Sequence, residues 1–286
     1  MFDYRAYDAV KALLQDKDRR FVVSIAEHIS NRSSENVKIL DVGAFDCRNT
    51  VALKLEMEAR GANPLIVAIE PDPTPTSKST ARAHNIAFRK LSFQELLLQP
   101  HAVGPKTYDC ILMQNLFYHI HSSEWRALLD ETRVLMHEES ECVVSLVSRD
   151  CSLYAYISEF LEKNDLTEKE RTFLSHGQYI FFEDLFDGRT DFGLNLSGSL
   201  EIASAIRLSD VTSSGFRRLS AAQKNSVKAS ALTRLSFFGR INPTHLKRLG
   251  EEAFASILRA QPPEGFQTID RIAILVAPAS HSKESK

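Results

Sequence analysis

The residues best suited to chemistry lie where short apolar runs end. The run Lys-Ile-Leu-Asp-Val-Gly occupies positions 38–43, so Gly43 directly follows a stretch that is typical of a buried strand. A glycine at that place lets the backbone turn sharply and lets a ligand approach closely. About 30 residues later, Glu70 ends the apolar run 65–70, where a carboxylate can accept hydrogen bonds from both hydroxyls of a ribose. Gly43 and Glu70 together predict a site for an adenosine-containing cofactor.

Two classes of cofactor fit this pair of residues, the nicotinamide dinucleotides and S-adenosylmethionine. A dinucleotide needs small residues where its pyrophosphate meets the N-terminus of the following helix. The residues two and four positions after Gly43 are Phe45 and Cys47, and their bulk crowds that approach. S-adenosylmethionine carries no phosphate and tolerates a bulkier loop. The residue types therefore favour a methyltransferase over a nicotinamide-dependent dehydrogenase.

These residues need a scaffold of alternating strands and helices, and the first half of the chain has that pattern. Near-continuous apolar runs separated by helical periodicity indicate a parallel sheet covered on both faces. The expected strands are 37–45, 65–70, 86–91, 108–114 and 141–148, and the expected helices are 49–59, 78–84 and 125–136. With two later strands, this predicts an α/β, doubly wound, Rossmann-like and mostly parallel seven-stranded sheet. Such a sheet binds its ligand at the carboxyl ends of its strands.

The second half of the chain has a different pattern, in which helical segments predominate. The two remaining strands are expected at 205–211 and 271–277, and helices at 153–161, 168–174, 230–238 and 244–258, with another starting at Glu183. We interpret residues 1–35 and 149–265 as helical cap elements on the substrate side of a single domain over 1–279. The polar tail 280–286 is expected to be disordered.

Composition restricts the expected partners. The 286 residues include 35 Lys and Arg and 37 Asp and Glu, a formal net charge of -2, which gives no electrostatic reason to bind nucleic acid or a membrane surface. The N-terminus does not have the pattern of a signal or transit peptide, and no apolar run approaches the ~20 residues that span a bilayer. Four separated cysteines without a CxxC pair predict buried free thiols. We expect a cytoplasmic monomer or weak dimer that acts on a small molecule.

The order of the motifs resembles that of class I S-adenosylmethionine-dependent methyltransferases. More specifically, the chain is similar to the histamine N-methyltransferase family, most of all in the string Gln-Asn-Leu-Phe-Tyr at 114–118. The likeness covers most of the chain, including an N-terminal helical segment and the terminal strand. The other segments that carry it are Val-Lys-Ile-Leu-Asp-Val-Gly at 37–43, Ala-Ile-Glu-Pro at 68–71, Phe-Arg-Lys-Leu-Ser-Phe at 88–93, Tyr-Asp-Cys-Ile-Leu-Met at 108–113, Gln-Tyr-Ile at 178–180 and Glu-Asp-Leu at 183–185.

The resemblance implies S-adenosylmethionine as the cofactor and assigns residues to it. An acid and a glycine after the first strand would border the methionine part, and a glutamate after the second strand would hold the ribose. Two residues after the third strand would lie near the adenine, with the backbone of a fourth-strand residue beside it. In chain order these residues are Asp41, Gly43, Glu70, Ser92, Phe93 and Met113.

The resemblance also implies a substrate pocket lined by Gln114, Phe117 and Tyr118. Aromatic faces there would attract a sulfonium or an amine through cation–π interactions, although Phe117 has the alternative of a place in the core. His119 is a further candidate, as a base near the substrate. His119 and His121 form a His-x-His pair, but the sequence offers them no acidic or cysteine partner at a spacing typical of metal ligands. No metal is therefore expected.

In the histamine N-methyltransferase family an Asn near the start of the terminal strand touches the substrate amine, and Asp270 holds the matching position here. The family's amine-binding Glu has its counterpart in Asp16 or Asp18. Methyl transfer demands alignment and exclusion of water. Asp270, Asp18 or Gln114 would orient the amine and stabilise the positive charge that it acquires. An acid at position 270 favours a cationic or differently shaped amine, so histamine does not follow as the substrate.

The leading hypothesis is an enzyme that methylates a nitrogen, or with less support an oxygen, of a small amine-bearing metabolite or natural product. Gln114, Tyr118 and Asp270 would be its catalytic residues. A rival from another class is a catalytically silent protein on the same fold that binds S-adenosylmethionine and acts as a regulator or partner. Phe45 and Cys47 motivate that rival because they replace the glycines of the first motif. Methylation of a protein or peptide is a third hypothesis and requires an open pocket.

Overall fold

The chain forms two compact units, each built from segments that are separated in the sequence. Unit 1 comprises residues 1–18, 147–181 and 202–270, and unit 2 comprises residues 19–146, 182–201 and 271–286. In the computed structural model of the chain, the described residues are 15–32, 36–100, 104–114, 116–117, 120, 122–152, 181–186, 193–207, 259 and 261–278. The single domain expected over 1–279 stays a prediction.

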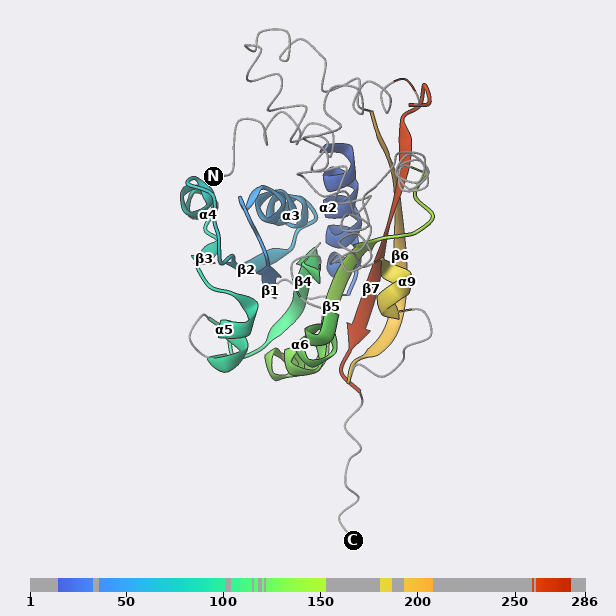
Figure 1. The fold of residues 1–286 in the computed structure, drawn as a ribbon. Coiled ribbons are helices and arrows are strands. Elements are labelled where there is room, and N and C mark those ends of the chain that lie inside the picture. Colours follow the sequence, from blue (N-terminus) through green and yellow to red (C-terminus); the bar gives the residue numbers. More distant parts are fainter. Residues whose placement is uncertain are drawn as a thin grey trace. The chain divides into compact units, whose positions relative to one another are not determined.

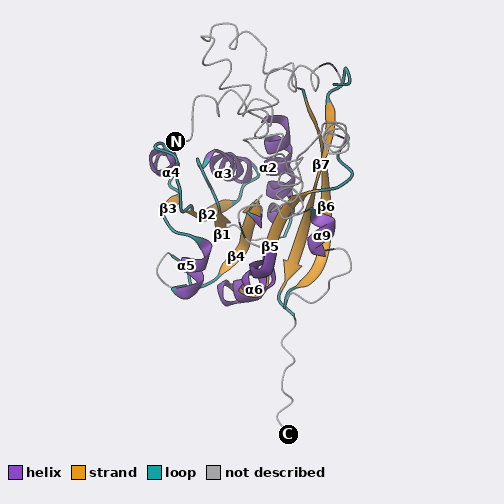
Figure 2. Cartoon of the chain, viewed as in Figure 1, coloured by secondary structure: helices purple, strands orange, loops and turns teal. Residues whose placement is uncertain are grey.

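Strands and helices alternate from the first strand to the fifth, as the sequence predicts (Figures 1 and 2). This half contains β1 (Asn36–Val42), α3 (Arg48–Ala59), β2 (Asn63–Ile69), α4 (Ser77–Ala83), β3 (Ala87–Arg89), α5 (Phe93–Leu98), β4 (Tyr108–Gln114), η3 (Ser122–Glu124), α6 (Trp125–Glu131), η4 (Thr132–Leu135) and β5 (Met136–Val147). The remaining described elements are α2 (Gln15–Ser30), α9 (Phe182–Phe186), β6 (Asn195–Ile206) and β7 (Phe266–Val276).

The seven strands form one sheet in the order β3-β2-β1-β4-β5-β7-β6. β1 pairs in parallel with β2 and β4, β2 with β3, and β4 with β5. The last four residues of β1 and of β2 are all buried, which is why these strands read as continuous apolar runs rather than as an alternating pattern. From β1 the chain winds outward to β3 and then returns to β4 on the other side of β1. The topological switch point therefore lies between β1 and β4.

β7 runs opposite to the parallel strands. The Ser148 N–H, just after β5, donates to the Ile269 carbonyl at 2.7 Å, and the Gln267 N–H donates to Ser152 Oγ at 2.9 Å. The partner number falls as the chain number rises, so β7 is antiparallel to β5. The predicted seven-stranded, mostly parallel α/β sheet is confirmed, as a mixed sheet whose antiparallel member is β7.

The same argument places β6 antiparallel to β7. Ser197 Oγ donates to the Ile274 carbonyl at 3.0 Å, and Ser204 Oγ lies 2.7 Å from Thr268 Oγ1. The predicted strand at 205–211 was wrong in position, because β6 occupies 195–206. Its burial alternates from Leu200 to Ser204, so only every second side chain is buried. Its small polar residues gave too weak an apolar signal for the sequence analysis to find it.

Two further elements differ from the prediction, one in its start and one in its presence. β5 begins at Met136 rather than at 141, and the sequence analysis missed this start because residues 137–139 are polar and half-buried or exposed. The helix α5 was missed altogether, although Ser92 and Glu95 have the spacing of a capping box and form one here. The predicted elements at 153–161, 168–174, 230–238 and 244–258 and the tail 280–286 lie outside the described residues.

All four cysteines are buried and free, as the sequence predicted. Burial raises the pKa of Cys47 to about 12, with the nearby Asp41 carboxylate adding to the shift, and burial alone raises the pKa of Cys142 to about 12. Such thiols stay protonated and unreactive at neutral pH. Within the described ranges, no helix has both the length and the apolar character needed to cross a membrane.

In unit 1, a buried ion pair joins the first turn of α2 to β7. Lys17 Nζ lies 2.9 Å from Asp270 Oδ2, and the two side chains are 5% and 1% exposed. Burial raises the pKa of Asp270, while Lys17 counteracts that shift and the nearby Asp18 adds to it. The Lys17 ammonium therefore opposes the effect of burial on this carboxylate.

Replacement of Lys17 by methionine leaves the Asp270 carboxylate buried without its cation. We expect Lys17→Met to lower the free energy of unfolding at pH 7 by about 3–5 kcal/mol, measured by urea denaturation. The loss should shrink at lower pH as Asp270 takes up a proton. The double variant Lys17→Met/Asp270→Leu should regain most of the stability, and an equal loss in single and double variants would contradict the pairing.

Candidate functional site

The ends of three neighbouring strands in unit 2 bring four predicted residues to one edge of the sheet. In the strand register, Asp41 lies beside Ala68 of β2 and Leu112 of β4. Gly43 follows β1, Glu70 follows β2, and Gln114 ends β4. This edge holds the carboxyl ends of the parallel strands and the switch point, which is where open α/β sheets bind ligands.

The loop after β1 has a left-handed backbone at alternate positions. The φ angles are 78° at Gly43, 47° at Phe45 and 62° at Cys47. A Cβ on Gly43 would lie 3.4 Å from Leu116 Cδ1, so glycine also leaves room for the segment after β4. Cys47 is fully buried, and its side chain is therefore enclosed by protein. The loop keeps the turns that glycines usually allow, although only the first of the three positions is glycine.

Hydrogen bonds hold the Phe45 residue in this conformation. Its N–H donates to Glu70 Oε2 at 3.0 Å, and its carbonyl accepts from Ser77 Oγ at 2.6 Å. Ser77 is itself fully buried and lies 2.8 Å from Thr74 Oγ1. A non-glycine residue at positive φ costs about 1–3 kcal/mol, and bonds to buried polar groups offset a cost of that size. Sequence analysis missed Ser77, because the serine carries no motif that marks this contact.

Glu70 is the most constrained carboxylate of this edge. Its Oε2 accepts from Phe45 and its Oε1 accepts from the Asp72 N–H at 2.9 Å. These bonds fix the carboxylate plane, and each oxygen retains a further lone pair. Two fixed acceptors side by side fit the paired hydroxyls of a ribose. The geometry therefore suits the group that the sequence analysis assigned to Glu70.

Asp41 is a second buried carboxylate at this edge. Its Oδ2 accepts from Thr50 Oγ1 at 2.5 Å. Burial raises the pKa of Asp41 to about 6, against the effect of the Thr50 hydrogen bond, and the charge of Glu70 raises it further. The two neighbouring carboxylates give this edge a negative potential, which attracts a cationic ligand.

Gln114 lies at the end of β4 and contacts the helix that follows β1. Its Oε1 accepts from Asn49 Nδ2 at 3.1 Å. Asn49 lies in the first turn of α3, so this bond links the two sides of the switch point. The sequence analysis did not single out Asn49, since one asparagine in a helical run carries no pattern of its own.

The residues assigned to the adenine have other contacts in this structure. The Ser92 hydroxyl accepts from the Glu95 N–H at 3.2 Å and donates to Glu95 Oε2 at 2.7 Å. Phe93 is buried, and Met113 is buried with its Sδ 4.0 Å from Cys142 Sγ. Ser92 therefore caps α5, and the contact of these three residues with a cofactor stays a prediction.

The residues assigned to the substrate fall in different places. Phe117 is fully buried, and its ring meets Trp125 edge-on with a centroid distance of 6.4 Å. Asp270 and Asp18 lie in unit 1, where Asp270 binds Lys17 and its Oδ1 accepts no hydrogen bond from any described residue. Tyr118, His119 and His121, and the side chain of Asp16, lie outside the described residues. The substrate roles stay predictions.

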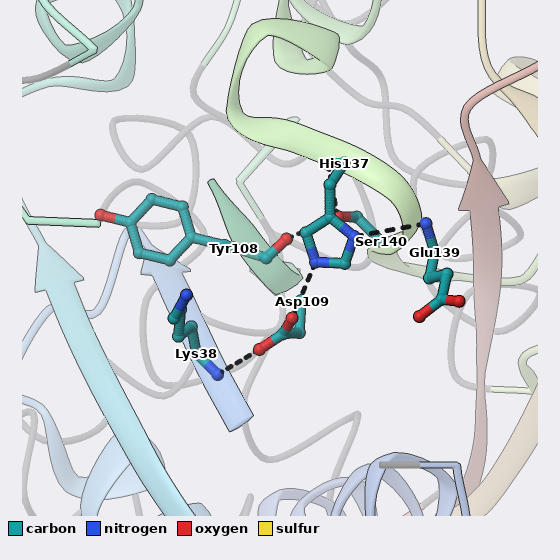
Figure 3. Close-up of polar contacts among 6 residues, drawn as sticks. All are labelled: Lys38, Tyr108, Asp109, His137, Glu139 and Ser140. Atoms are coloured by element: carbon teal, nitrogen blue, oxygen red, sulfur yellow. Dashed lines mark hydrogen bonds and ion pairs between the residues drawn. The ribbon is translucent and has the colours of Figure 1, made fainter. Parts of the chain in front are cut away.

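A second polar cluster lies at the opposite edge of the sheet in unit 2 and superficially resembles a catalytic triad (Figure 3). His137 Nε2 lies 2.7 Å from Asp109 Oδ1, and His137 Nδ1 accepts from the Glu139 N–H at 3.3 Å. The ring therefore donates through Nε2. Ser140 Oγ donates to the Tyr108 carbonyl at 2.6 Å instead of to the histidine. Ser140 Oγ accepts from the His137 backbone N–H at 2.7 Å, but the serine hydroxyl does not bond to the imidazole ring, so this cluster is a structural link between β4 and β5.

A hollow of about 490 Å³ adjoins this cluster, and Arg32, Asp109, His137 and Glu141 contribute to its lining. Glu141 is buried and is held by His28 Nε2 at 2.7 Å and by Arg32. Its charge is thus neutralised within the protein. In the part of the chain that the structure describes, no group of His, Cys, Asp or Glu side chains is arranged to hold a metal ion. The edge with Asp41 and Glu70 remains the better candidate site.

Comparisons with known proteins identify the fold. Phosphoethanolamine N-methyltransferase 2 of Haemonchus contortus, solved with S-adenosylhomocysteine, matches with a TM-score of 0.51 and 9% identity over 90% of this chain and 52% of that chain. Magnesium protoporphyrin IX methyltransferase of Synechocystis PCC 6803, also solved with S-adenosylhomocysteine, matches with a TM-score of 0.50 and 10% identity over 93% of each chain. No family model and no curated protein sequence matches this chain. The chain therefore has the Rossmann-like fold of class I methyltransferases.

The left-handed backbone at Phe45 predicts an inverted order of stability for two substitutions. At an ordinary position alanine is more stable than glycine, but at positive φ the Cβ is strained. We expect Phe45→Gly to be about 1 kcal/mol more stable than Phe45→Ala in urea denaturation. In α3, Ala52→Gly should instead destabilise by about 1 kcal/mol. If Phe45→Ala proves the more stable of the two loop variants, the loop is not held as described.

The raised pKa of Asp41 predicts a pH dependence of stability. Because its pKa rises from 3.8 to about 6 on folding, Asp41 favours the folded state below pH 4, and this contribution is lost as the pH rises through 6. Asp41→Asn keeps an acceptor for Thr50 without a charge. We expect this variant to be about 3 kcal/mol more stable than the wild type at pH 7.5 and to lose that advantage near pH 4, by urea denaturation without added ligand. A difference in stability between the variant and the wild type that stays constant from pH 4 to pH 7.5 would contradict the raised pKa of Asp41.

Proposed function

We propose that this protein is an S-adenosylmethionine-dependent methyltransferase that acts on a small amine-bearing metabolite or natural product, with nitrogen favoured over oxygen as the acceptor. The observation that carries the proposal is the set of residues at the switch-point edge. Gly43 allows the close turn, and Glu70 offers two fixed acceptors. The two compared methyltransferases, both solved with S-adenosylhomocysteine, support the choice of cofactor.

The described residues suit a cationic cofactor with an adenosine group. Glu70 would accept hydrogen bonds from both ribose hydroxyls, and Asp41 and Gly43 would border the methionine part, whose ammonium is attracted by the buried carboxylates. Ser92, Phe93 and the Met113 backbone would complete the adenine side. The cofactor supplies an electrophilic methyl group on a sulfonium. The protein must align the acceptor with that methyl group and exclude water, which are the main demands of an in-line displacement.

An amine acceptor fits the charges of the site. The nitrogen becomes positive as it takes the methyl group, and the carboxylates of Asp41 and Glu70 stabilise positive charge in this region. Gln114 would orient the acceptor, with Tyr118 and His119 beside it and the buried Phe117 supporting them from its contact with Trp125. The resemblance also assigns Asp270 and Asp18 to the amine, and this role stays a prediction because both residues lie in unit 1. The resemblance to the histamine N-methyltransferase family supports these assignments.

A second candidate function is a silent protein that binds the cofactor without transferring its methyl group. Phe45 and Cys47 favour it, because both hold strained conformations where glycine is usual. Two measurements separate the candidates. Calorimetric titration with S-adenosylhomocysteine tests binding, and transfer of a labelled methyl group to a panel of small amines tests catalysis. The proposal expects both, whereas binding without transfer to any amine favours the silent protein.

Glu70 gives the sharpest mutational test of the cofactor assignment. Glu70→Ala removes the acceptors for two hydroxyls and for the Phe45 N–H, so we expect the affinity for S-adenosylhomocysteine to fall about 100-fold or more. Glu70→Gln keeps one acceptor oxygen and should lose less. Glu56→Gln, which alters a surface ion pair with Arg60 on α3, is the matched control and should leave the affinity unchanged. Unaltered binding by Glu70→Ala would refute the ribose role.

A further inference from the structure

The amide side chains of Asn49 and Gln114 meet across the switch point between β1 and β4. Asn49 is the second residue of α3, the helix that follows β1, and Gln114 is the last residue of β4. Asn49 Nδ2 donates to Gln114 Oε1 at 3.1 Å. Both side chains are half-buried. The bond therefore lies at the place where the fold binds its ligands, within unit 2.

This hydrogen bond engages the oxygen end of the Gln114 amide and leaves its NH₂ end for a ligand. An amide has a carbonyl oxygen that only accepts and an NH₂ group that only donates. The oxygen of Gln114 is engaged by Asn49, and its Nε2 has no partner among the residues that the structure describes. The two ends of a planar amide diverge from the same carbon, so Nε2 points away from Asn49. The oxygen keeps one further lone pair, but both N–H groups of Nε2 are unengaged by the described residues, so Gln114 presents two donors to a ligand.

A half-buried donor selects the chemistry of the ligand beside it. A ligand that leaves the N–H groups without an acceptor loses affinity, because the donor has been partly removed from water. A protonated amine or a hydroxyl proton does not satisfy it, whereas a carbonyl oxygen or a ring nitrogen does. A carboxylate would also accept, but the neighbouring charges disfavour it, since Asp41 is bonded to Thr50, the residue next to Asn49. A neutral acceptor fits best.

We propose that Asn49 is a positioning residue that fixes the amide of Gln114, and that the methyl acceptor carries a neutral hydrogen-bond acceptor, such as a carbonyl oxygen or a ring nitrogen, beside its nucleophilic amine. The inference rests on the proposed function and narrows its substrate class. Asn49 acts through Gln114 and not on the reacting atoms.

A matched pair of probes tests the substrate class. 2-(2-Aminoethyl)pyridine and 2-phenylethylamine have nearly the same shape and the same amine, and they differ in one ring nitrogen. Their affinities for the protein saturated with S-adenosylhomocysteine can be compared by saturation-transfer NMR. We expect the pyridine compound to bind about three- to tenfold more tightly, the gain from one well-placed hydrogen bond. Equal affinities, or binding of neither probe, would overturn the inference.

Variants at position 49 test the positioning role. Aspartate is isosteric with asparagine and only accepts, so Asn49→Asp forces Gln114 to donate to it and to turn its carbonyl toward the ligand. The negative charge of the aspartate acts on the amines of both probes alike. The ratio of the two affinities therefore reports only the orientation of the Gln114 amide, and we expect this ratio to fall to about one. An aspartate in the first turn of α3 is favourable to the helix. Asn63→Asp, at an exposed pair with Asn36, is the matched control and should keep the preference.

The NMR resonance of the Asn49 side-chain amide tests the hydrogen bond to Gln114 directly. In protein with ¹⁵N-labelled side-chain amides, Gln114→Met should shift the Asn49 NH₂ resonance, because that group loses its acceptor. No such shift would contradict the bond direction on which the inference depends. Failure to bind S-adenosylhomocysteine would contradict the proposed function itself. Normal binding of S-adenosylhomocysteine with no discrimination between the probes would remove only the present inference.

Discussion

Glu70 joins the ends of the first two strands, and the geometry of the candidate site depends on it. One oxygen accepts from the backbone of Phe45 in the loop after β1, and the other accepts from Asp72 in the loop after β2. Ser77 holds the same Phe45 peptide from its other side. A loop that lacks two of the usual glycines is thereby kept in their conformation. The carboxylate also keeps lone pairs for a ligand, so one residue both shapes the loop and presents acceptors.

The charges of the site follow from the same arrangement. Parallel pairing brings Asp41 and Glu70 to one edge, where their negative potential favours a cation and disfavours the pyrophosphate of a dinucleotide. The bulk of Phe45 and Cys47 predicted the same preference from the sequence, but the structure gives it a different basis. Cys47 is enclosed by protein, so its bulk does not limit access to the loop. The preference for a cationic cofactor over a dinucleotide therefore rests mainly on the buried carboxylates of Asp41 and Glu70.

The sequence predicted the parallel strands and a ligand site at their carboxyl ends, and it placed Gly43, Glu70 and Gln114 at those ends, because a buried strand leaves a continuous apolar run whose end can be read. It did not predict Ser77 or Asn49, whose roles depend on contacts between residues distant along the chain. β6 was misplaced because a half-exposed strand of small polar residues has little apolar signal. α5 was missed although Ser92 and Glu95 carried a readable capping signature.

The central claim is that the cofactor lies at the carboxyl ends of β1, β2 and β4. A crystal structure of the protein grown with S-adenosylhomocysteine tests it most directly. The account predicts density beside Gly43, with both ribose hydroxyls within hydrogen-bonding distance of Glu70 and that carboxylate still bonded to the Phe45 backbone. Density in the hollow lined by Arg32 and His137 at the opposite edge, or a ribose that contacts other residues than Glu70, would contradict it.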